Sequence, residues 1–192
     1  MLKNLLKTQK LISLIKEFKT KEIFDIVVYG SLVRGKDKPS DIDIAIVLNE
    51  EISVNEKLEL AERVKNKLDL LGGNFDVKAI GLSDLYDEGF IARQAILAEG
   101  YSLIYEKFLH EKFGFKTSVI FKYKLDKLDY SHKKMFYYAL NGRRKQKGLL
   151  ELKGAKMMGD CVVKVPLIHS EEFKDMFKLN GIDYKIENSV EY

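Results

Sequence analysis

The sequence predicts an α/β (α+β) protein, with a mixed β-sheet flanked by helices and then a small C-terminal α+β domain. Short apolar runs at 23–29, 41–48 and 75–80 have the length of strands, and apolar stripes at helical spacing separate them. The chain has 192 residues, 46% of them hydrophobic, which suits one large or two small domains. The pattern of apolar and charged residues changes near residue 107, which places the first domain at residues 1–107 and the second at 108–192.

The other elements of the first domain follow from the spacing of apolar residues and from glycines that end helices. We expect helices over residues 2–18, 55–71 and 83–99 and a short strand over residues 101–105. The helix over 55–71 is expected to bury a stripe of Leu58, Ala61, Val64, Leu68 and Leu71.

The second domain has mixed patterns that match no family known to us. We expect helices over residues 131–141 and 171–179, and strands over residues 161–167 and 183–186. Its core is expected to hold Phe136, Tyr137, Tyr138, Met157, Met158 and Cys161. Cys161 is the only cysteine, so the sequence has neither an internal disulfide nor a thiolate metal cluster.

Charge is divided unevenly between the two halves. Residues 1–107 hold 16 Lys and Arg against 18 Asp and Glu, a net charge of −2, whereas residues 108–192 hold 17 against 11, a net charge of +6. The second half is therefore the part expected to meet an anionic partner. A dense basic cluster follows the helix over 131–141 and consists of Arg143, Arg144, Lys145 and Lys147. It is either a phosphate contact for RNA or DNA, or a solvated loop after a helix end.

No membrane or secretion segment is expected. The apolar stretch 2–18 is interrupted by several charged residues, so it lacks the unbroken run of a signal peptide or a membrane span. We expect a soluble, cytoplasmic protein. The three histidines, His110, His132 and His169, are far apart in the sequence and are expected to fill surface or hydrogen-bonded roles.

The most informative stretch, 27–48, predicts a strand, a Gly30–Ser31 turn, a short helix at 32–34, a basic loop and a second strand. In that second strand Asp41 and Asp43 alternate with apolar residues, so both carboxylates point to one face. Adjacent carboxylates repel each other unless a cation lies between them, and hard oxygen ligands suit Mg²⁺. The turn's N–H groups and the Ser31 hydroxyl suit a phosphate. Together these features indicate a nucleoside triphosphate site.

Asp76 is the unusual residue of the third apolar strand. It shares a face with Lys78, opposite the apolar side chains, and an unpaired carboxylate there needs a metal, a cation or open water. The rival candidate, Asp69, lies on a helix, where its direction is wrong for the same site. An exposed residue on an edge strand is the alternative explanation for Asp76.

The motif resembles the nucleotidyltransferase superfamily that includes DNA polymerase β, and especially its small minimal nucleotidyltransferases. The matching positions are Gly30, Ser31, Arg34, Gly35, Ser40, Asp41 and Asp43. The resemblance covers residues 1–107 and implies a nucleotidyltransferase fold with a third carboxylate on a neighbouring strand, for which Asp76 fits. It implies catalytic and metal-binding roles for Asp41, Asp43 and Asp76 with two Mg²⁺ ions. The expected nucleotide-binding residues are Gly30, Ser31, Arg34, Ser40 and Lys78.

The expected activity is transfer of a nucleoside monophosphate from an NTP, with ATP favoured, to an acceptor hydroxyl with release of pyrophosphate. The acceptor is open between an RNA or DNA end, a partner protein, as in antitoxin-type adenylyltransferases, and a small molecule. A non-catalytic nucleotide- or nucleic-acid-binding module is the alternative from another class.

Overall fold

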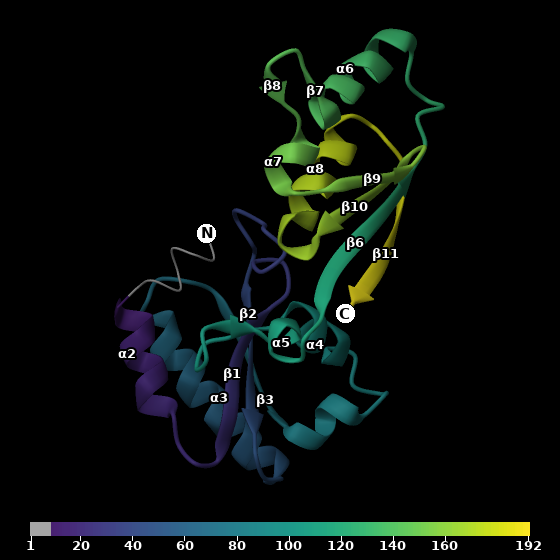
Figure 1. The fold of residues 1–192 in the computed structure, drawn as a ribbon. Helices are drawn as coiled ribbons and strands as arrows, with labels where there is room; N and C mark the ends of the chain where they lie inside the picture. Colours follow the sequence, from purple (N-terminus) through teal and green to yellow (C-terminus); the bar gives the residue numbers. More distant parts are fainter. Residues whose placement is uncertain (1–8) are drawn as a thin grey trace. The chain divides into compact units, whose positions relative to one another are not determined.

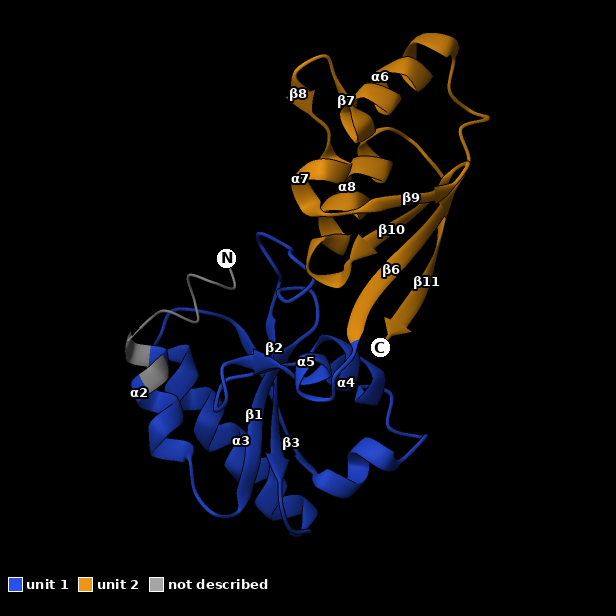
Figure 2. Cartoon of the chain, in the orientation of Figure 1, with its two compact units in different colours: residues 1–115 blue, residues 116–192 orange. Residues whose placement is uncertain are grey.

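A computed structural model describes residues 9–192 and separates them into two compact units (Figure 1). The first unit ends at Phe115 and the second runs from Lys116 to Tyr192, as Figure 2 shows in two colours. The first unit therefore continues past the boundary near 107. The reason is that Leu109 is buried in its core and its N–H donates to the Gly100 carbonyl oxygen over 2.9 Å.

The first unit alternates helices with a five-stranded sheet of order β3-β2-β1-β4-β5. Its strands are β1 (Ile23–Tyr29), β2 (Ile42–Leu48), β3 (Phe75–Gly81), β4 (Tyr101–Ser102) and β5 (Lys107–Phe108). Its helices are α2 (Gln9–Phe18), α3 (Val54–Asp69), the 3₁₀ helix η1 (Leu82–Tyr86), α4 (Arg93–Glu99) and α5 (Leu109–Lys112). β1 pairs antiparallel with β2, and β2 pairs parallel with β3, so the predicted mixed sheet is confirmed.

Two apolar layers cover the two faces of this sheet. On one face the isoleucines of β2 meet Leu11 and Phe18 of α2 and Val64 and Leu68 of α3. On the other face the alternate residues of β1 and β2 meet α4 and α5. Alternation of side chains along each strand therefore supplies both cores. The strand residues on the second face point to the same side of the sheet as Asp43.

Three expectations for the first unit need correction or fall outside the described residues. Leu58 is 63% exposed, because the buried stripe of α3 runs in four-residue steps from Leu68 through Val64 to the partly buried Leu60. The strand expected over 101–105 is limited to β4. Of the helix expected over 2–18, residues 2–8 lie outside the described part of the chain.

The single helix expected over 83–99 is instead two short helices, η1 and α4. The Asp84 carboxylate accepts from the Gly81 N–H over 2.8 Å, and Asp87 accepts from the Gly89 N–H over 2.8 Å. Such short polar side chains hold the backbone in turns and compete with helix formation. The helix therefore starts again only at Arg93.

The second unit is built on a four-stranded antiparallel sheet of order β11-β6-β10-β9. Its strands are β6 (Lys116–Tyr123), β7 (Gly142–Arg143), β8 (Gln146–Lys147), β9 (Lys156–Gly159), β10 (Val162–Pro166) and β11 (Tyr184–Glu191). Its helices are α6 (Tyr130–Asn141), α7 (Leu149–Lys153), the 3₁₀ helix η2 (Leu167–His169) and α8 (Ser170–Leu179). Without the β7–β8 hairpin and α7, this is the βαββαβ arrangement called ferredoxin-like.

The core of the second unit is aromatic. The ring of Phe177 lies 5.1–5.8 Å, centroid to centroid, from the rings of Tyr123, Phe121, Tyr184 and Phe136. Several residues expected in this core lie outside it: Met157 and Met158 are exposed because β9 is an edge strand, and Tyr137 is 60% exposed on α6. Tyr138 and Cys161 are only half-buried.

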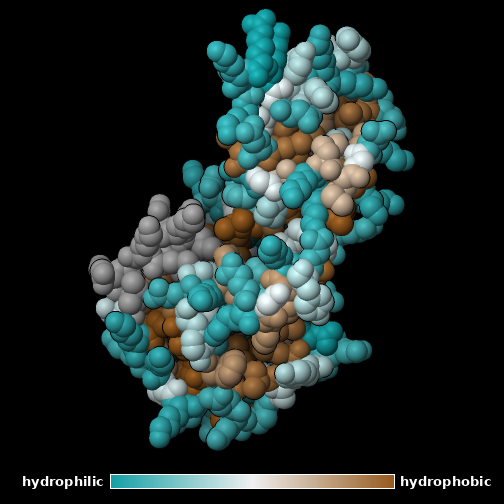
Figure 3. Space-filling model, viewed as in Figure 1, coloured by the Kyte–Doolittle hydropathy of each residue, from teal (hydrophilic) through white to brown (hydrophobic). Residues whose placement is uncertain are grey.

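None of the helices in the described part of the chain combines the length and the apolar character that crossing a bilayer requires. On the space-filling surface, hydrophilic residues cover much of the end of the second unit that carries α6 and the hairpin (Figure 3).

The aromatic core yields a stability prediction with a control in the same helix. Phe177→Ala is expected to lower the free energy of unfolding by about 3–5 kcal/mol, because it empties a fully buried site. Leu179→Ala, at a side chain 87% exposed, is expected to cost less than about 0.5 kcal/mol. Denaturant unfolding followed by circular dichroism measures both, and equal losses would contradict the assigned core.

A second prediction concerns Asp25, a buried carboxylate on β1. One of its oxygens accepts from the Ser102 hydroxyl over 2.7 Å and from the Ile26 N–H, while Oδ2 has no hydrogen-bond partner among the described residues. Burial raises the pKa of Asp25 above its usual 3.8, although these hydrogen bonds act to lower it. The folded state then binds its proton more tightly than the unfolded state, so stability falls as the pH rises from 3.8 through the raised pKa.

Asp25→Asn keeps an acceptor for Ser102 and Ile26 but cannot ionise. Its melting temperature relative to the natural chain is expected to rise with pH above 3.8 and then to level off. Asp37→Asn, at an exposed position, serves as the control. A melting difference for Asp25→Asn that is independent of pH would refute this assignment.

Candidate functional site

The turn after β1 is closed by backbone hydrogen bonds around Gly30 and Ser31. The Arg34 N–H donates to the Gly30 carbonyl oxygen over 3.2 Å, and the Lys36 N–H donates to the Ser31 carbonyl oxygen over 3.0 Å. The short helix expected at 32–34 is therefore a single hydrogen-bonded turn. It ends at Gly35, whose φ of 98° leaves the helical region.

The register of two parallel strands brings the carboxylates together. Asp43 of β2 and Asp76 of β3 are direct partners, so their side chains leave the sheet on the same face. Asp41 lies two residues before Asp43, at the entry to β2, and has the same parity. The three residues singled out from the sequence thus lie at one end of two neighbouring strands.

Gly30 lies directly against this group. A Cβ atom on Gly30 would come within 2.1 Å of Asp43 Oδ2, and the φ of Gly30 is +78°. Glycine is therefore required at position 30 for two reasons: its backbone conformation, and the space that the Asp43 carboxylate occupies beside it. This close approach places the turn and the carboxylates in one site.

The electrostatics show a site with an excess of negative charge. Burial raises the pKa of Asp43, and the charges of Asp41 and Asp76 raise it further, while Lys78 and Arg34 act in the opposite direction. A carboxylate in this position is stabilised by any cation that joins it. The donor set is therefore one that fits a hard divalent ion.

Nearby polar groups already engage two of the carboxylates. Lys78 Nζ lies 3.2 Å from Asp76 Oδ2, and both side chains are about half-exposed. The Ser40 hydroxyl donates to Asp41 Oδ1 over 2.9 Å. Lys78 and Ser40, both expected at the nucleotide site, therefore lie beside the carboxylates.

Arg34 is held by a residue that sequence reasoning did not find. Its Nη1 lies 2.6 Å from Oε2 of Glu99, a buried residue at the end of α4. The ion pair fixes the guanidinium near Asp43, to which it contributes a favourable charge. The 65 positions between the two residues explain why no local pattern could have identified Glu99.

Tyr29 is the second residue that was missed. It is the register partner of Asp43 on the antiparallel side and is buried. Burial, together with the charges of Asp43 and Asp76, raises the pKa of Tyr29 to about 12. The phenol is therefore a neutral wall of the site at physiological pH. Tyr29 could have been found from the sequence, because it is the last residue of the strand that leads into the Gly30–Ser31 turn and pairs with β2.

Among the described residues, no three His, Cys, Asp or Glu side chains are already gathered closely enough to enclose a metal ion. In general, Mg²⁺ is bound by one or two carboxylates together with substrate phosphates. The histidines have hydrogen-bonding partners of their own: His110 with Ala98, His132 with Asp129 and His169 with Glu172.

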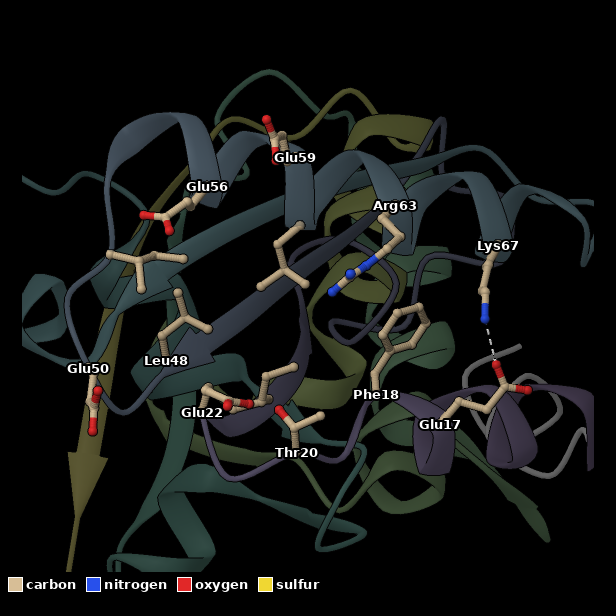
Figure 4. A pocket seen from close by; sticks show the side chains of 13 residues that line it. Glu17, Phe18, Thr20, Glu22, Leu48, Glu50, Glu56, Glu59, Arg63 and Lys67 are labelled. Carbon is tan, nitrogen blue, oxygen red and sulfur yellow. Dashed lines mark hydrogen bonds and ion pairs between the residues drawn. The ribbon is translucent and has the colours of Figure 1, made fainter.

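The first unit also has a cavity of about 670 Å³, whose lining residues Figure 4 shows. It is lined by Ile23 and Leu48, at the opposite ends of β1 and β2 from Gly30 and Asp43, and Leu48 lies about 17 Å along β2 from Asp43. Its glutamates are Glu17, Glu22, Glu50, Glu56 and Glu59. It contains none of the motif residues, and we assign the functional site by its chemistry rather than by the size of this cavity.

Arg143, Arg144, Lys145 and Lys147 belong to the second unit, on and around the β7–β8 hairpin. Their expected role is nucleic-acid binding, which is separate from the chemistry of the carboxylate site.

Comparison with known families agrees with this geometry. Residues 9–107 match the family described as "Polymerase beta, Nucleotidyltransferase". The chain belongs to this family. It is a nucleotidyltransferase, and the match covers every residue of the carboxylate site.

Several solved structures have a partial similarity to this nucleotidyltransferase. A toxin–antitoxin structure with AMP-PNP is 24% identical, with 49% of this chain and 69% of that chain covered and a TM-score of 0.35. A mutant of the toxin–antitoxin MntA–HpeT is 21% identical, with the same coverage and TM-score. The complex of a tri-AMPylated Shewanella oneidensis HEPN toxin with MNT antitoxin is 24% identical, with 49% and 66% covered and a TM-score of 0.33. A comparison with curated proteins gives no match.

Two glycines with similar positive φ values allow a matched test of the site. Gly30 and Gly72 have φ values of +78° and +82°, but a Cβ on Gly72 meets nothing within 4 Å. Each change to Ala is expected to cost roughly 1 kcal/mol in stability. Only Gly30→Ala displaces the Asp43 carboxylate, so it alone is expected to lower nucleotidyl transfer, by about 100-fold. Equal activity in the two variants would show that the close approach of Gly30 to Asp43 is irrelevant to function.

Proposed function

We propose that this nucleotidyltransferase moves a nucleoside monophosphate from an NTP, with ATP favoured, to an acceptor hydroxyl and releases pyrophosphate. The observation that carries the proposal is the pairing of Asp43 with Asp76 on adjacent strands, with Asp41 alongside and the Gly30–Ser31 turn in contact. A cluster of carboxylates against a phosphate-sized turn suits metal-assisted phosphoryl chemistry.

The turn supplies the phosphate-binding side of the site. Backbone N–H groups at Gly30 and Ser31 and the Ser31 hydroxyl bind the distal phosphates. Arg34, held by Glu99, adds a fixed positive charge near them, and Ser40 and Lys78 border the triphosphate from the carboxylate side. Positioning of this kind accounts for a large part of the rate of such transfers.

The carboxylates supply the reacting side. Asp41 and Asp43 would hold two Mg²⁺ ions with the triphosphate, and Asp76 would share the ion beside the acceptor. When bound, Mg²⁺ neutralises the phosphate oxygens and the departing pyrophosphate. Asp76 orients the acceptor hydroxyl and accepts its proton as the oxygen bonds to the α-phosphorus and the bond to pyrophosphate breaks. Tyr29, kept neutral, closes the back of the site.

The acceptor is drawn from three classes: an RNA or DNA end, a hydroxyl of a partner protein, or a small molecule. Residues 116–192 hold 16 Lys and Arg against 10 Asp and Glu, a net charge of +6. This charge favours an anionic acceptor. Incubation with α-labelled ATP, Mg²⁺ and cell lysate tests the choice, because the labelled fraction identifies the acceptor as nucleic acid, protein or small molecule.

The central test replaces the paired carboxylates. Asp41→Asn with Asp43→Asn is expected to abolish Mg²⁺-dependent ATP binding and to lower transfer by roughly 100-fold or more, while the fold is kept. Asp37→Asn, on the exposed loop before them, removes one negative charge outside the site and is expected to leave both properties intact. Calorimetry with ATP, with and without Mg²⁺, measures the binding. Unchanged Mg-ATP affinity in the double variant would place the nucleotide elsewhere.

A further inference from the structure

One segment of the second unit is rich in positive charge. Residues 130–150 contain no Asp or Glu. Their six cationic residues, all exposed, are Lys133, Lys134, Arg143, Arg144, Lys145 and Lys147. They come from α6 and the β7–β8 hairpin, and we call this set the α6–hairpin surface. Figure 3 shows this end of the unit as predominantly hydrophilic.

The hairpin is anchored by a close approach that only glycine allows. A Cβ on Gly148 would come within 2.2 Å of the Gly142 nitrogen, and a Cβ on Gly142 would come within 2.3 Å of the Gln146 carbonyl oxygen. Gly142 pairs with Lys147 and Arg143 with Gln146, so Arg144 and Lys145 form a two-residue turn at the tip. The cations are therefore presented on a defined backbone.

The turn itself departs from ordinary turn chemistry. Arg144 has a φ of +54°, a conformation for which Gly, Asn or Asp is usual. Arg143, Arg144, Lys145 and Gln146 line an open hollow of about 490 Å³. A charged, unbranched residue thus holds a strained position at the point where the hairpin meets solvent.

The cations at the tip are available for a ligand. Within the described part of the chain, Arg144 and Lys145 form no ion pair, and Arg143 lies 4.9 Å from the centroid of the Tyr138 ring rather than against a carboxylate. Lys147 differs, because its Nζ lies 2.6 Å from Glu151. The available charge is therefore concentrated on residues 143–145.

Exposed aromatic side chains lie on α6, where they accompany two further cations of this surface. Tyr130 is 80% exposed and Tyr137 is 60% exposed, and a separation of seven residues puts them on the same helix face. Lys133 and Lys134 lie between them in the sequence. Exposed aromatic rings beside unpaired cations are the combination that binds single-stranded nucleic acid, with bases stacked on rings and phosphates on cations.

We propose that the α6–hairpin surface binds single-stranded nucleic acid, with phosphates on Arg143, Arg144 and Lys145 and a base stacked on Tyr137. This binding goes beyond the nucleotidyl transfer proposed above and does not depend on it.

The four-stranded sheet of the same unit is a poorer candidate. Two of its lysines are neutralised across strands, since Lys122 pairs with Glu187 at 2.6 Å and Lys164 pairs with Glu191. A membrane surface is also a poorer partner, because the hairpin tip has no apolar side chain to insert among lipids.

The test compares two variants of the full chain that each remove three positive charges from the second unit. Arg143→Ala/Arg144→Ala/Lys145→Ala changes the hairpin, and Lys156→Ala/Lys178→Ala/Lys185→Ala changes exposed lysines elsewhere. Binding of labelled poly-U and poly-dT oligonucleotides is measured over a salt series. The hairpin variant is expected to bind about tenfold or more weakly, with a log–log salt slope smaller by roughly 2, since each lost contact on a single strand contributes roughly 0.7. The control variant is expected to keep most of the affinity.

A second comparison isolates stacking from charge. Tyr137→Ala is expected to weaken binding by about fivefold or more with an unchanged salt slope. Tyr86→Ala, at a tyrosine 82% exposed in the first unit, is expected to leave binding unchanged. Preference for poly-U over poly-dT, or the reverse, distinguishes RNA from DNA.

Three results would overturn the proposal. One is the absence of oligonucleotide binding by the full chain at low salt. Another is equal loss in the two triple variants, which indicates general charge attraction. The third is equally strong, equally hairpin-dependent binding of anionic lipid vesicles or of polyglutamate. Mg²⁺-dependent ATP binding is followed in parallel, so failure of this surface and failure of the carboxylate site are separable.

Discussion

Crowding of negative charge at one end of a sheet is the constraint on which the first unit depends. The parallel register of β2 and β3 sets Asp43 opposite Asp76, and the entry to β2 adds Asp41. Burial and mutual repulsion both disfavour the ionised form of Asp43. The surrounding fold must therefore fix this arrangement, and a cation beside it would lower its free energy. The close approach of Gly30 places the Gly30–Ser31 turn at the same point.

The surroundings of the carboxylates are arranged to hold that charge in place. Both faces of the sheet are buried, so the strands cannot shift register without exposing an apolar core. Glu99 fixes Arg34 beside the site, and Lys78 approaches Asp76 from the exposed side. Tyr29 contributes a buried hydroxyl that stays protonated, because burial and then the charges of Asp43 and Asp76 raise its pKa. Apolar packing thus maintains an electrostatic arrangement that is unfavourable by itself.

The second unit follows a different principle. Its stability lies in an aromatic cluster centred on Phe177, and cross-strand ion pairs neutralise Lys122 and Lys164 of its sheet. Positive charge is densest on α6 and the β7–β8 hairpin, and the hairpin is an insertion in the βαββαβ arrangement. An insertion of this kind adds surface without disturbing the core, which is why charge is tolerated there.

The sequence alone determined the three strands of the nucleotidyl site and the shared face of their carboxylates, because side-chain alternation in a strand is a local property. It also determined α3, α6 and α8, whose stripes and caps lie within a few residues of each other. Only the tertiary structure decided that Glu99 holds Arg34, that Gly30 contacts Asp43, and that Leu58 and Met157 are exposed. These contacts depend on which elements pack together, and the residues involved are far apart in the sequence. The helix expected over 83–99 did not form as one helix, because side-chain hydrogen bonds of Asp84 and Asp87 hold the backbone in turns. Local pattern fixes where a side chain points, and packing decides what it meets.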